Sequence, residues 1–201
     1  SEWLGQCAQE FKILAFCLSE PGAGSDVAGL QLHAEKDGGD YILNGTKAWI
    51  TNGGYADIYT VFATLDRGAR HKGMCAFVVP KGTPGLSPGR KEDKMGHRAS
   101  NTTLVHFDNV RVPASQRLGE EGEGFKIAMA TLDRARPQVA ALAVGVARRA
   151  LEESLAYVQE RKAFGQAIGE FQGVQFMLAD MAKSIEASRL LTAQAAWLLD
   201  A

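Results

Sequence analysis

The sequence predicts an α+β protein in which a sheet of antiparallel strands is followed by long helices. From about Phe11 to about Pro113 the apolar residues alternate with a period of two, and turn residues separate the runs. From Gly124 onward the chain is rich in Ala, Leu, Arg and Glu, and its apolar residues follow helical spacing. We therefore expect two domains, a small β-barrel or sandwich over residues 1–118 and helices over residues 119–201.

Composition and charge indicate a soluble protein and give no reason to expect nucleic acid or an anionic membrane as a partner. The chain has 201 residues, of which 46% are hydrophobic, and a formal net charge of -1. No apolar run reaches the roughly 18 residues of a membrane-spanning helix. The three cysteines and four histidines lack metal-ligand spacing, so we expect no metal site. Because the cysteines are few and their count is odd, we expect them to be reduced thiols in the core. Reduced thiols are typical of a bacterial cytoplasm or a mitochondrial matrix.

Turn signals divide the first part of the chain into strands. A short apolar run covers residues 14–18, and Asn44-Gly45 lies between two apolar runs in the pattern of a hairpin turn. The polar segment 66–73 is expected to be a hairpin loop, and the proline-containing segment 81–89 an irregular connection. Further strands are expected at residues 29–35, 58–64, 74–79 and 103–112.

Two amphipathic helices follow the strands. Apolar residues from Val144 to Val158 fall on one face of the first helix, and those from Phe171 to Ile185 on one face of the second. Glycines at positions 165 and 169 mark the turn between them, which makes the helices antiparallel neighbours. Two helices with one apolar stripe each cannot enclose a core, so we expect further helices from missing sequence or from another subunit.

A glycine-rich turn follows the first apolar run, from Glu20 to Asp26. Gly22 and Gly24 allow a backbone to approach a ligand closely, and such a turn presents N–H groups to polar or anionic atoms. Position 27 is Val, where a dinucleotide-binding loop would need a third glycine, and no Gly-Lys-Ser/Thr follows. The turn is therefore either a ligand-binding loop of another kind or a wide connection between two strands.

Four blocks of sequence, in order along the chain, resemble signatures of the acyl-CoA dehydrogenases. They are FCLSEPGAGSD at residues 16–26, NGTKAWITNG at 44–53, LDRARP at 132–137 and ERKAFG at 160–165. The resemblance implies the family's middle β domain followed by the first two helices of its carboxy-terminal four-helix bundle. We therefore expect an incomplete four-helix bundle, and a chain that is an internal fragment of a longer protein.

The resemblance implies FAD as the cofactor, held between two segments of backbone. Phe16, Leu18 and Ser19 would contact the edge of the isoalloxazine ring through backbone atoms. The second segment would supply an aromatic wall and polar groups, with the Thr51 hydroxyl near the reactive ring nitrogen. The alternative for Trp49 is a core position on an alternating strand. The cofactor-binding residues implied for this part of the chain are Phe16, Leu18, Ser19, Gly24, Trp49, Ile50 and Thr51.

Arg161, Phe164 and Gln172 match family positions that reach the pyrophosphate and adenine half of FAD in a neighbouring subunit. A guanidinium pairs bidentately with phosphate oxygens, which suits Arg161 to this role. The alternative is that Arg161 only favours the carboxyl end of its own helix electrostatically. The match would require at least a homodimer, and a homotetramer agrees with it equally.

Ser25, Asp133 and Arg136 match family positions that line the acyl-CoA pocket. Ser25 would hydrogen-bond the pantetheine or phosphate portion, and the other two would lie at the adenosine end. The alternative for Asp133 and Arg136 is an ion pair on a helix surface. The α-proton of a thioester needs a base. In the family that base lies beyond the position of Ala201 or at that of Ala135, so we expect no catalytic residue in this chain.

Several functions stay open on the sequence alone. The resemblance implies an FAD-dependent acyl-CoA dehydrogenase of fatty acid β-oxidation, which forms a trans-2-enoyl-CoA and passes electrons to an electron-transfer flavoprotein. The missing base and the incomplete bundle instead favour a non-catalytic flavin-binding or oligomerisation module. An acyl-CoA oxidase, which passes electrons to oxygen, is a further alternative, and the length of the acyl chain is not fixed.

Overall fold

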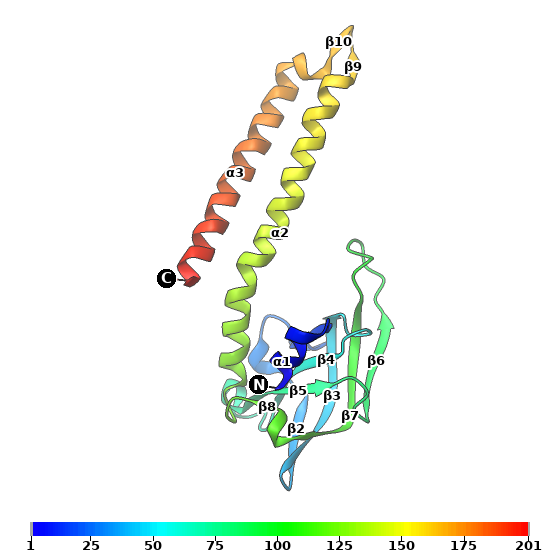
Figure 1. Cartoon of the computed structure of the whole chain (residues 1–201), viewed down its shortest axis with the longest axis vertical. Coiled ribbons are helices and arrows are strands. Elements are labelled where there is room, and N and C mark those ends of the chain that lie inside the picture. Colours follow the sequence, from blue (N-terminus) through cyan, green and yellow to red (C-terminus); the bar gives the residue numbers. More distant parts are fainter. Residues whose placement is uncertain (1, 201) are drawn as a thin grey trace. The chain divides into compact units, whose positions relative to one another are not determined.

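The structure, a computed structural model, describes residues 2–200 of the chain. It consists of two compact units, Ser1–Met129 and Ala130–Ala201. The first unit contains a large sheet and the second contains long helices (Figure 1). The predicted α+β class, with an antiparallel sheet followed by antiparallel helices, is confirmed.

The described strands of the first unit form one sheet that is mostly antiparallel. Its path runs β6-β7-β3-β2-β4-β5-β8, and β1 pairs with β4 outside this path. The β1–β4 and β2–β4 pairs are parallel. The strands are β1 (Leu14–Cys17), β2 (His33–Asp37), β3 (Asp40–Thr51), β4 (Ile58–Thr64), β5 (Met74–Pro80), β6 (Leu86–Lys91), β7 (Thr102–Pro113) and β8 (Arg117–Leu118).

Short helices precede and connect these strands. Helix α1 (Glu2–Gln9) comes before the sheet. Single 3-10 turns form η1 (Val27–Gly29), η2 (Arg70–Gly73) and η3 (Ala114–Gln116). The turn η2 lies in the segment that was expected to be a hairpin loop, and the chain does turn there between β4 and β5.

The core of the first unit lies along β3, β4, β5 and β7. Strands β4 and β5 are buried along almost their whole length. Tyr41 packs against Phe77 with ring centres 4.9 Å apart, and burying a side chain of the size of Phe stabilises by about 1.5–3 kcal/mol. Cys17 and Cys75 are free thiols in this core, as predicted, whereas Cys7 is a half-buried free thiol on α1 outside the core, so the prediction is wrong for that residue. Burial raises the pKa of the Cys17 thiol to about 12.

The predicted hairpin turn at Asn44-Gly45 is wrong, because β3 continues through both residues. Asn44 instead lies opposite a bulge in β7, where Asn109 has a left-handed φ of 52° and donates its N–H to the Asn44 side-chain oxygen. A Cβ at Gly45 would lie 2.9 Å from the Cα of Leu32, so the glycine permits close approach rather than a turn. The real hairpin joins β2 to β3 through Gly38-Gly39, a signal that the sequence analysis passed over.

The irregular connection predicted at residues 81–89 is only partly correct. Strand β6 begins at Leu86 within that segment and pairs with β7 at the edge of the sheet. An edge strand tolerates Pro88, because on its outer side no neighbouring strand requires a backbone N–H.

In the second unit, helices α2 and α3 run antiparallel, as predicted (Figure 1). Helix α2 (Gly124–Glu160) begins at the end of the first unit, and α3 (Gln172–Asp200) follows it. They are joined by the two-stranded hairpin β9 (Lys162–Ala163) and β10 (Gln166–Ala167) and by η4 (Ile168–Glu170). The hairpin turns at Phe164 and Gly165, whose φ angles of 53° and 84° are those of a tight hairpin turn.

The two helices of the second unit do not enclose a core. Of the residues described in α3, none is buried. This agrees with the prediction that two helices with one apolar stripe each are insufficient. No helix within residues 2–200 combines the length and hydropathy needed to cross a membrane. The exposed large apolar side chains of these helices include Val139, Leu142, Val146, Phe176, Met177, Leu191 and Trp197.

Two glycines between β5 and β6 provide a test of strand packing. Gly82 and Gly85 have almost the same left-handed φ, 81° and 85°. A Cβ at Gly82 meets open space, whereas one at Gly85 overlaps the carbonyl oxygen of Asp108 on β7. Alanine at either position costs about 1–2 kcal/mol of folding free energy from its conformation alone. We expect Gly85→Ala to cost a further 1–3 kcal/mol, about the usual penalty of overpacking.

Chemical denaturation of the two variants measures this difference directly. Gly82→Ala is the matched control, because it carries the same backbone penalty without the overlap. Equal midpoints for the two variants would show that β6 and β7 do not approach each other as closely as described.

Candidate functional site

A buried ion pair joins the glycine-rich turn to β3. The ammonium of Lys47, which is fully buried, donates to Glu20 Oε1 at 2.8 Å and to the Leu18 carbonyl oxygen at 3.0 Å. Glu20 is only 7% exposed. Its carboxylate also accepts the backbone N–H groups of Gln31 at 2.6 Å and Leu32 at 3.0 Å. Burial lowers the pKa of Lys47, and the Glu20 charge opposes that shift.

A backbone hydrogen bond joins the same two segments. The Ala48 N–H on β3 donates to the Ser19 carbonyl oxygen at 2.8 Å. The structure thus brings together the two segments, 16–19 and 49–51, that the sequence analysis assigned to the flavin. The carbonyls of Leu18 and Ser19 already accept hydrogen bonds from β3. The backbone N–H groups there are therefore the better candidates for contact with a ligand.

Trp49 lies on a bulge of β3 and is presented to the outside. Lys47 pairs with Val105 and Ile50 with Thr103, so two residues of β3 lie opposite one of β7. Trp49 has a φ of 60° and its side chain is 64% exposed. A left-handed backbone is strained for an aromatic residue, at a cost of about 1–3 kcal/mol, and such strain is concentrated at binding sites. The alternative of a core position for Trp49 is therefore wrong, whereas Ile50 is a core residue.

The remaining predicted residues of the first unit surround this junction. Phe16 is half-buried, with its ring edge-on to Phe62 at 5.0 Å between ring centres. Thr51 is exposed at the end of β3, and Gly24 and Ser25 are exposed in the turn. A Cβ at Gly24 would meet nothing within 4 Å. An exposed indole, a hydroxyl and an open glycine backbone suit a flat aromatic ligand with polar edges, such as a flavin.

An ion pair that the sequence analysis did not identify holds the far end of the turn. The guanidinium of Arg70 donates to both carboxylate oxygens of Asp26 at 2.9 Å. Arg70 has a left-handed φ of 51°. Arg67 on the same segment donates to the Gln31 carbonyl oxygen at 3.1 Å. The segment between β4 and β5 therefore also holds the turn in place. In the sequence, the only signal of this role was that the segment is rich in charged residues.

In the second unit, Asp133 and Arg136 form the ion pair that was considered as their alternative role. The Arg136 guanidinium lies 2.6 Å from the Asp133 carboxylate, and both side chains are exposed on α2. Ala135 between them carries no titratable group. An exposed pair of this kind contributes only about 0.2–0.5 kcal/mol to the helix, so the pairing leaves both side chains available to a ligand.

The other predicted residues of the second unit lie on the connection between α2 and α3. Phe164 is 97% exposed, and its ring is edge-on to Phe171 at 6.2 Å. Arg161 and Gln172 are exposed as well. Throughout residues 2–200, the Arg161 guanidinium has no carboxylate within ion-pair distance. The group is therefore available to an anion.

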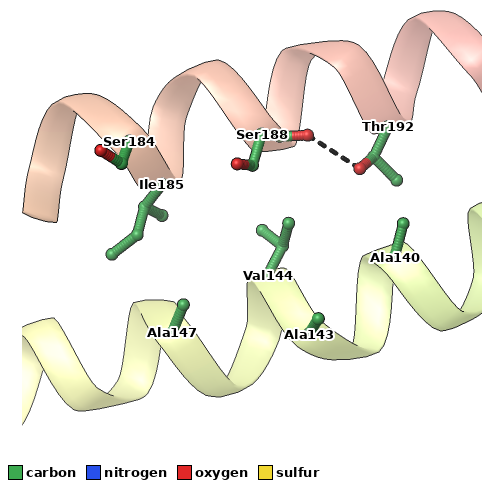
Figure 2. A pocket seen from close by; sticks show the side chains of 8 residues that line it. All are labelled: Ala140, Ala143, Val144, Ala147, Ser184, Ile185, Ser188 and Thr192. Carbon is green, nitrogen blue, oxygen red and sulfur yellow. Dashed lines mark hydrogen bonds between the residues drawn. The ribbon is translucent and has the colours of Figure 1, made fainter.

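A groove of about 390 Å³ lies between α2 and α3, away from these residues (Figure 2). Small side chains of the two helices face each other across it, and the Thr192 hydroxyl donates to the Ser188 carbonyl oxygen of its own helix. With no titratable side chain in its lining, the groove offers no acid–base chemistry. Its lining residues are Ala140, Ala143, Val144, Ala147, Ser184, Ile185, Ser188 and Thr192.

The chemistry of the junction is that of binding rather than proton transfer. Glu20 and Asp26, the carboxylates of the turn, are both engaged, the first by Lys47 and two backbone N–H groups and the second by Arg70. No group of three or more His, Cys, Asp or Glu side chains suited to a metal occurs in the described part of the chain. The junction can therefore hold a ligand, but it supplies no evident base.

Two family models match successive parts of the chain, and whole relatives match nearly all of it. The model of the acyl-CoA dehydrogenase middle domain matches residues 15–110, and that of the acyl-CoA dehydrogenase C-terminal domain matches residues 122–201. The mouse protein named short-chain specific acyl-CoA dehydrogenase, mitochondrial, is 47% identical over 199 residues, which are 99% of this chain and 48% of the mouse protein. The chain thus spans about half the length of the curated relatives it matches.

Solved structures agree with these matches. Butyryl-CoA dehydrogenase from Megasphaera elsdenii is 48% identical with a TM-score of 0.95, and the match covers 97% of this chain and 51% of that one. The prolyl acyl carrier protein oxidase AnaB is 38% identical with a TM-score of 0.94, and the match covers 98% of this chain and 52% of that one. With its sheet matching the middle domain and its helices the C-terminal domain, the chain belongs to the acyl-CoA dehydrogenase family.

Proposed function

We propose that the complete gene product is an FAD-dependent acyl-CoA dehydrogenase that converts an acyl-CoA thioester to a trans-2-enoyl-CoA. The observation that supports this best is the junction of the glycine-rich turn with the Trp49 bulge, held together by Lys47 and Glu20. When bound, FAD would accept the hydride that leaves the β-carbon of the substrate.

The residues of the junction fit a flavin. The exposed indole of Trp49 offers an aromatic wall, and the Thr51 hydroxyl a hydrogen bond at the ring. Phe16, Leu18, Ser19 and Gly24 would contribute backbone. Because the Ile50 side chain is buried, this residue would also contact the flavin through its backbone.

The second unit supplies groups suited to the other end of the cofactor. The exposed guanidinium of Arg161 suits a pyrophosphate, and the exposed ring of Phe164 suits an adenine. Gln172 is exposed at the start of α3 and would add a hydrogen bond. We propose that these residues bind FAD held by a neighbouring subunit, which makes the protein at least a homodimer.

The exposed hydroxyl of Ser25 would bind the pantetheine or phosphate portion of acyl-CoA, and Asp133 and Arg136 its adenosine end. Because Glu20 and Asp26 are engaged and position 135 is alanine, we propose that the base comes from outside residues 2–200. The mouse relative is named mitochondrial. We propose that the protein acts in a mitochondrial matrix or a bacterial cytoplasm. Its electrons would pass to an electron-transfer flavoprotein.

A second candidate is an oxidase, in which oxygen takes the electrons. Its support is the similarity to a structure named as a prolyl acyl carrier protein oxidase. A non-catalytic flavin-binding module is the third candidate, because the junction supplies no evident base.

Turnover of butyryl-CoA by the complete gene product tests the proposal. Relatives named for short-chain and butyryl substrates make this thioester the first choice. We expect a trans-2-enoyl-CoA product when an artificial electron acceptor is present, and little oxygen uptake when it is omitted. Oxygen uptake at the rate of product formation would identify an oxidase instead. FAD binding without any product from a series of chain lengths would support the non-catalytic module.

The role of Arg161 is tested by comparing Arg161→Ala with Lys162→Ala. Both residues are exposed neighbours on the α2–α3 connection, but only Arg161 is assigned to a phosphate. Hydrogen bonds to charged groups contribute about 1.5–3 kcal/mol, so we expect Arg161→Ala to weaken FAD binding by about tenfold or more. Equilibrium dialysis measures this loss, and equal affinities in the two variants would contradict a cofactor site shared between subunits.

The role of Thr51 is tested by the visible spectrum of the bound flavin. Thr51→Val keeps the shape of the side chain but removes its hydroxyl, so we expect the flavin absorbance bands to shift while the unfolding midpoint changes little. Thr51→Ser retains the hydroxyl and should keep the original spectrum. An unshifted spectrum in the valine variant would remove Thr51 from the site.

A further inference from the structure

Three consecutive residues of β3 have different roles where the strand meets the glycine-rich turn. Lys47 points inward and is fully buried. Ala48 is buried as well, and its N–H holds the Ser19 carbonyl oxygen. Trp49 is exposed with a left-handed backbone. The bulge is what allows an outward indole to follow two buried residues directly.

The Lys47 ammonium fixes the turn at two points. It holds the Leu18 carbonyl oxygen at 3.0 Å and the Glu20 carboxylate at 2.8 Å. Through Glu20 it is also connected to the N–H groups of Gln31 and Leu32, which lie just before β2. The backbone before Gly22 and Gly24 is therefore held by Lys47 directly, and the backbone after them is held by Lys47 through Glu20.

Stability alone does not account for this pair. Removing two charges from water costs several kcal/mol per ion, and apolar side chains of similar size are often equally stable in such places. An apolar side chain at position 47 could not hold the Leu18 carbonyl or the Glu20 carboxylate. What the ion pair adds is therefore a fixed geometry of the backbone around it.

We propose that Lys47 is a positioning residue of the flavin site, which with Glu20 locks the Leu18–Ser19 backbone against β3 and so holds Trp49 in its outward conformation. The affinity for FAD rests on the proposed function. The conformation of Trp49 does not, because it can be measured whether or not the protein binds FAD.

The test replaces Lys47 by Met in the complete gene product, in a background where every other tryptophan is Phe, Trp3 and Trp197 of this chain among them. Methionine keeps an unbranched chain but removes the ammonium. We expect FAD to bind at least about tenfold more weakly, because losses of this size are typical when a residue that holds a binding group in place is removed. Without FAD, the emission maximum and acrylamide quenching of Trp49 should also change.

The control breaks an ion pair at the opposite end of the same strand. Arg111 on β7 pairs with Asp37 and with Asp40, the first residue of β3, and its side chain is exposed. Arg111→Met removes these pairs without affecting any contact of the glycine-rich turn at residues 20–26. FAD affinity and Trp49 emission should both stay at their original values in this variant.

Two further measurements apply even if Lys47→Met does not fold. Glu20→Gln keeps the size of the side chain and an oxygen acceptor while removing its charge, so we expect smaller changes in the same direction. In the unmodified protein, hydrogen exchange of the Ala48 amide should slow when FAD is added, because this amide belongs to the fastened backbone. Where the protein binds FAD, an Ala48 amide that exchanges at the same rate with and without the cofactor would argue against the proposal.

The outcomes separate this proposal from the proposed function. A folded Lys47→Met variant with the original FAD affinity and the original Trp49 emission would overturn the positioning role. If the unmodified protein does not bind FAD, the proposed function fails instead. Trp49 emission in the variant then decides whether Lys47 positions the indole.

Discussion

The first unit depends on one buried pair of charges, Lys47 and Glu20. A charge inside a protein must be paired and hydrogen-bonded, and the chain meets this requirement with backbone groups that precede and follow the glycine-rich turn. The same contacts determine the path of the turn between β1 and β2. Because the turn is fastened to β3 immediately before the bulge, the ion pair, the turn and the exposed indole of Trp49 form one structure rather than three separate features.

Local patterns predicted the strands well where alternation and burial agree, and failed where pairing overrides a local signal. The strand at residues 58–64 was predicted with the bounds that the structure gives β4. Asn44-Gly45 has the composition of a hairpin turn, yet both residues lie within β3 between two neighbouring strands. Gly45 is there because Leu32 approaches its Cα. A glycine can thus signal close packing as well as a turn, and one sequence does not distinguish the two.

The candidate site was predicted in its segments but not in what holds them together. The four blocks identified the turn, the Trp49 segment and the α2–α3 connection. The Lys47–Glu20 pair spans 27 positions of the chain and the Arg70–Asp26 pair 44. Periodicity and turn chemistry describe neighbours in sequence, so neither pair, nor the left-handed backbone of Trp49, could be derived from them. Only the folded arrangement shows that a lysine in a strand is a buried anchor.

The hydrogen bonds of the turn also determine what it cannot do. Both oxygens of the Glu20 carboxylate already accept hydrogen bonds, from two backbone N–H groups and from the Lys47 ammonium, so Glu20 is poorly placed to remove a proton from carbon. Asp26 is held at both oxygens by Arg70. Freeing Glu20 to act as a base would release the Gln31 and Leu32 backbone that it holds, and freeing Asp26 would break its ion pair with Arg70. Rigid binding of a ligand and proton transfer therefore exclude each other at this turn, and the reaction proposed here needs a base from another part of the protein.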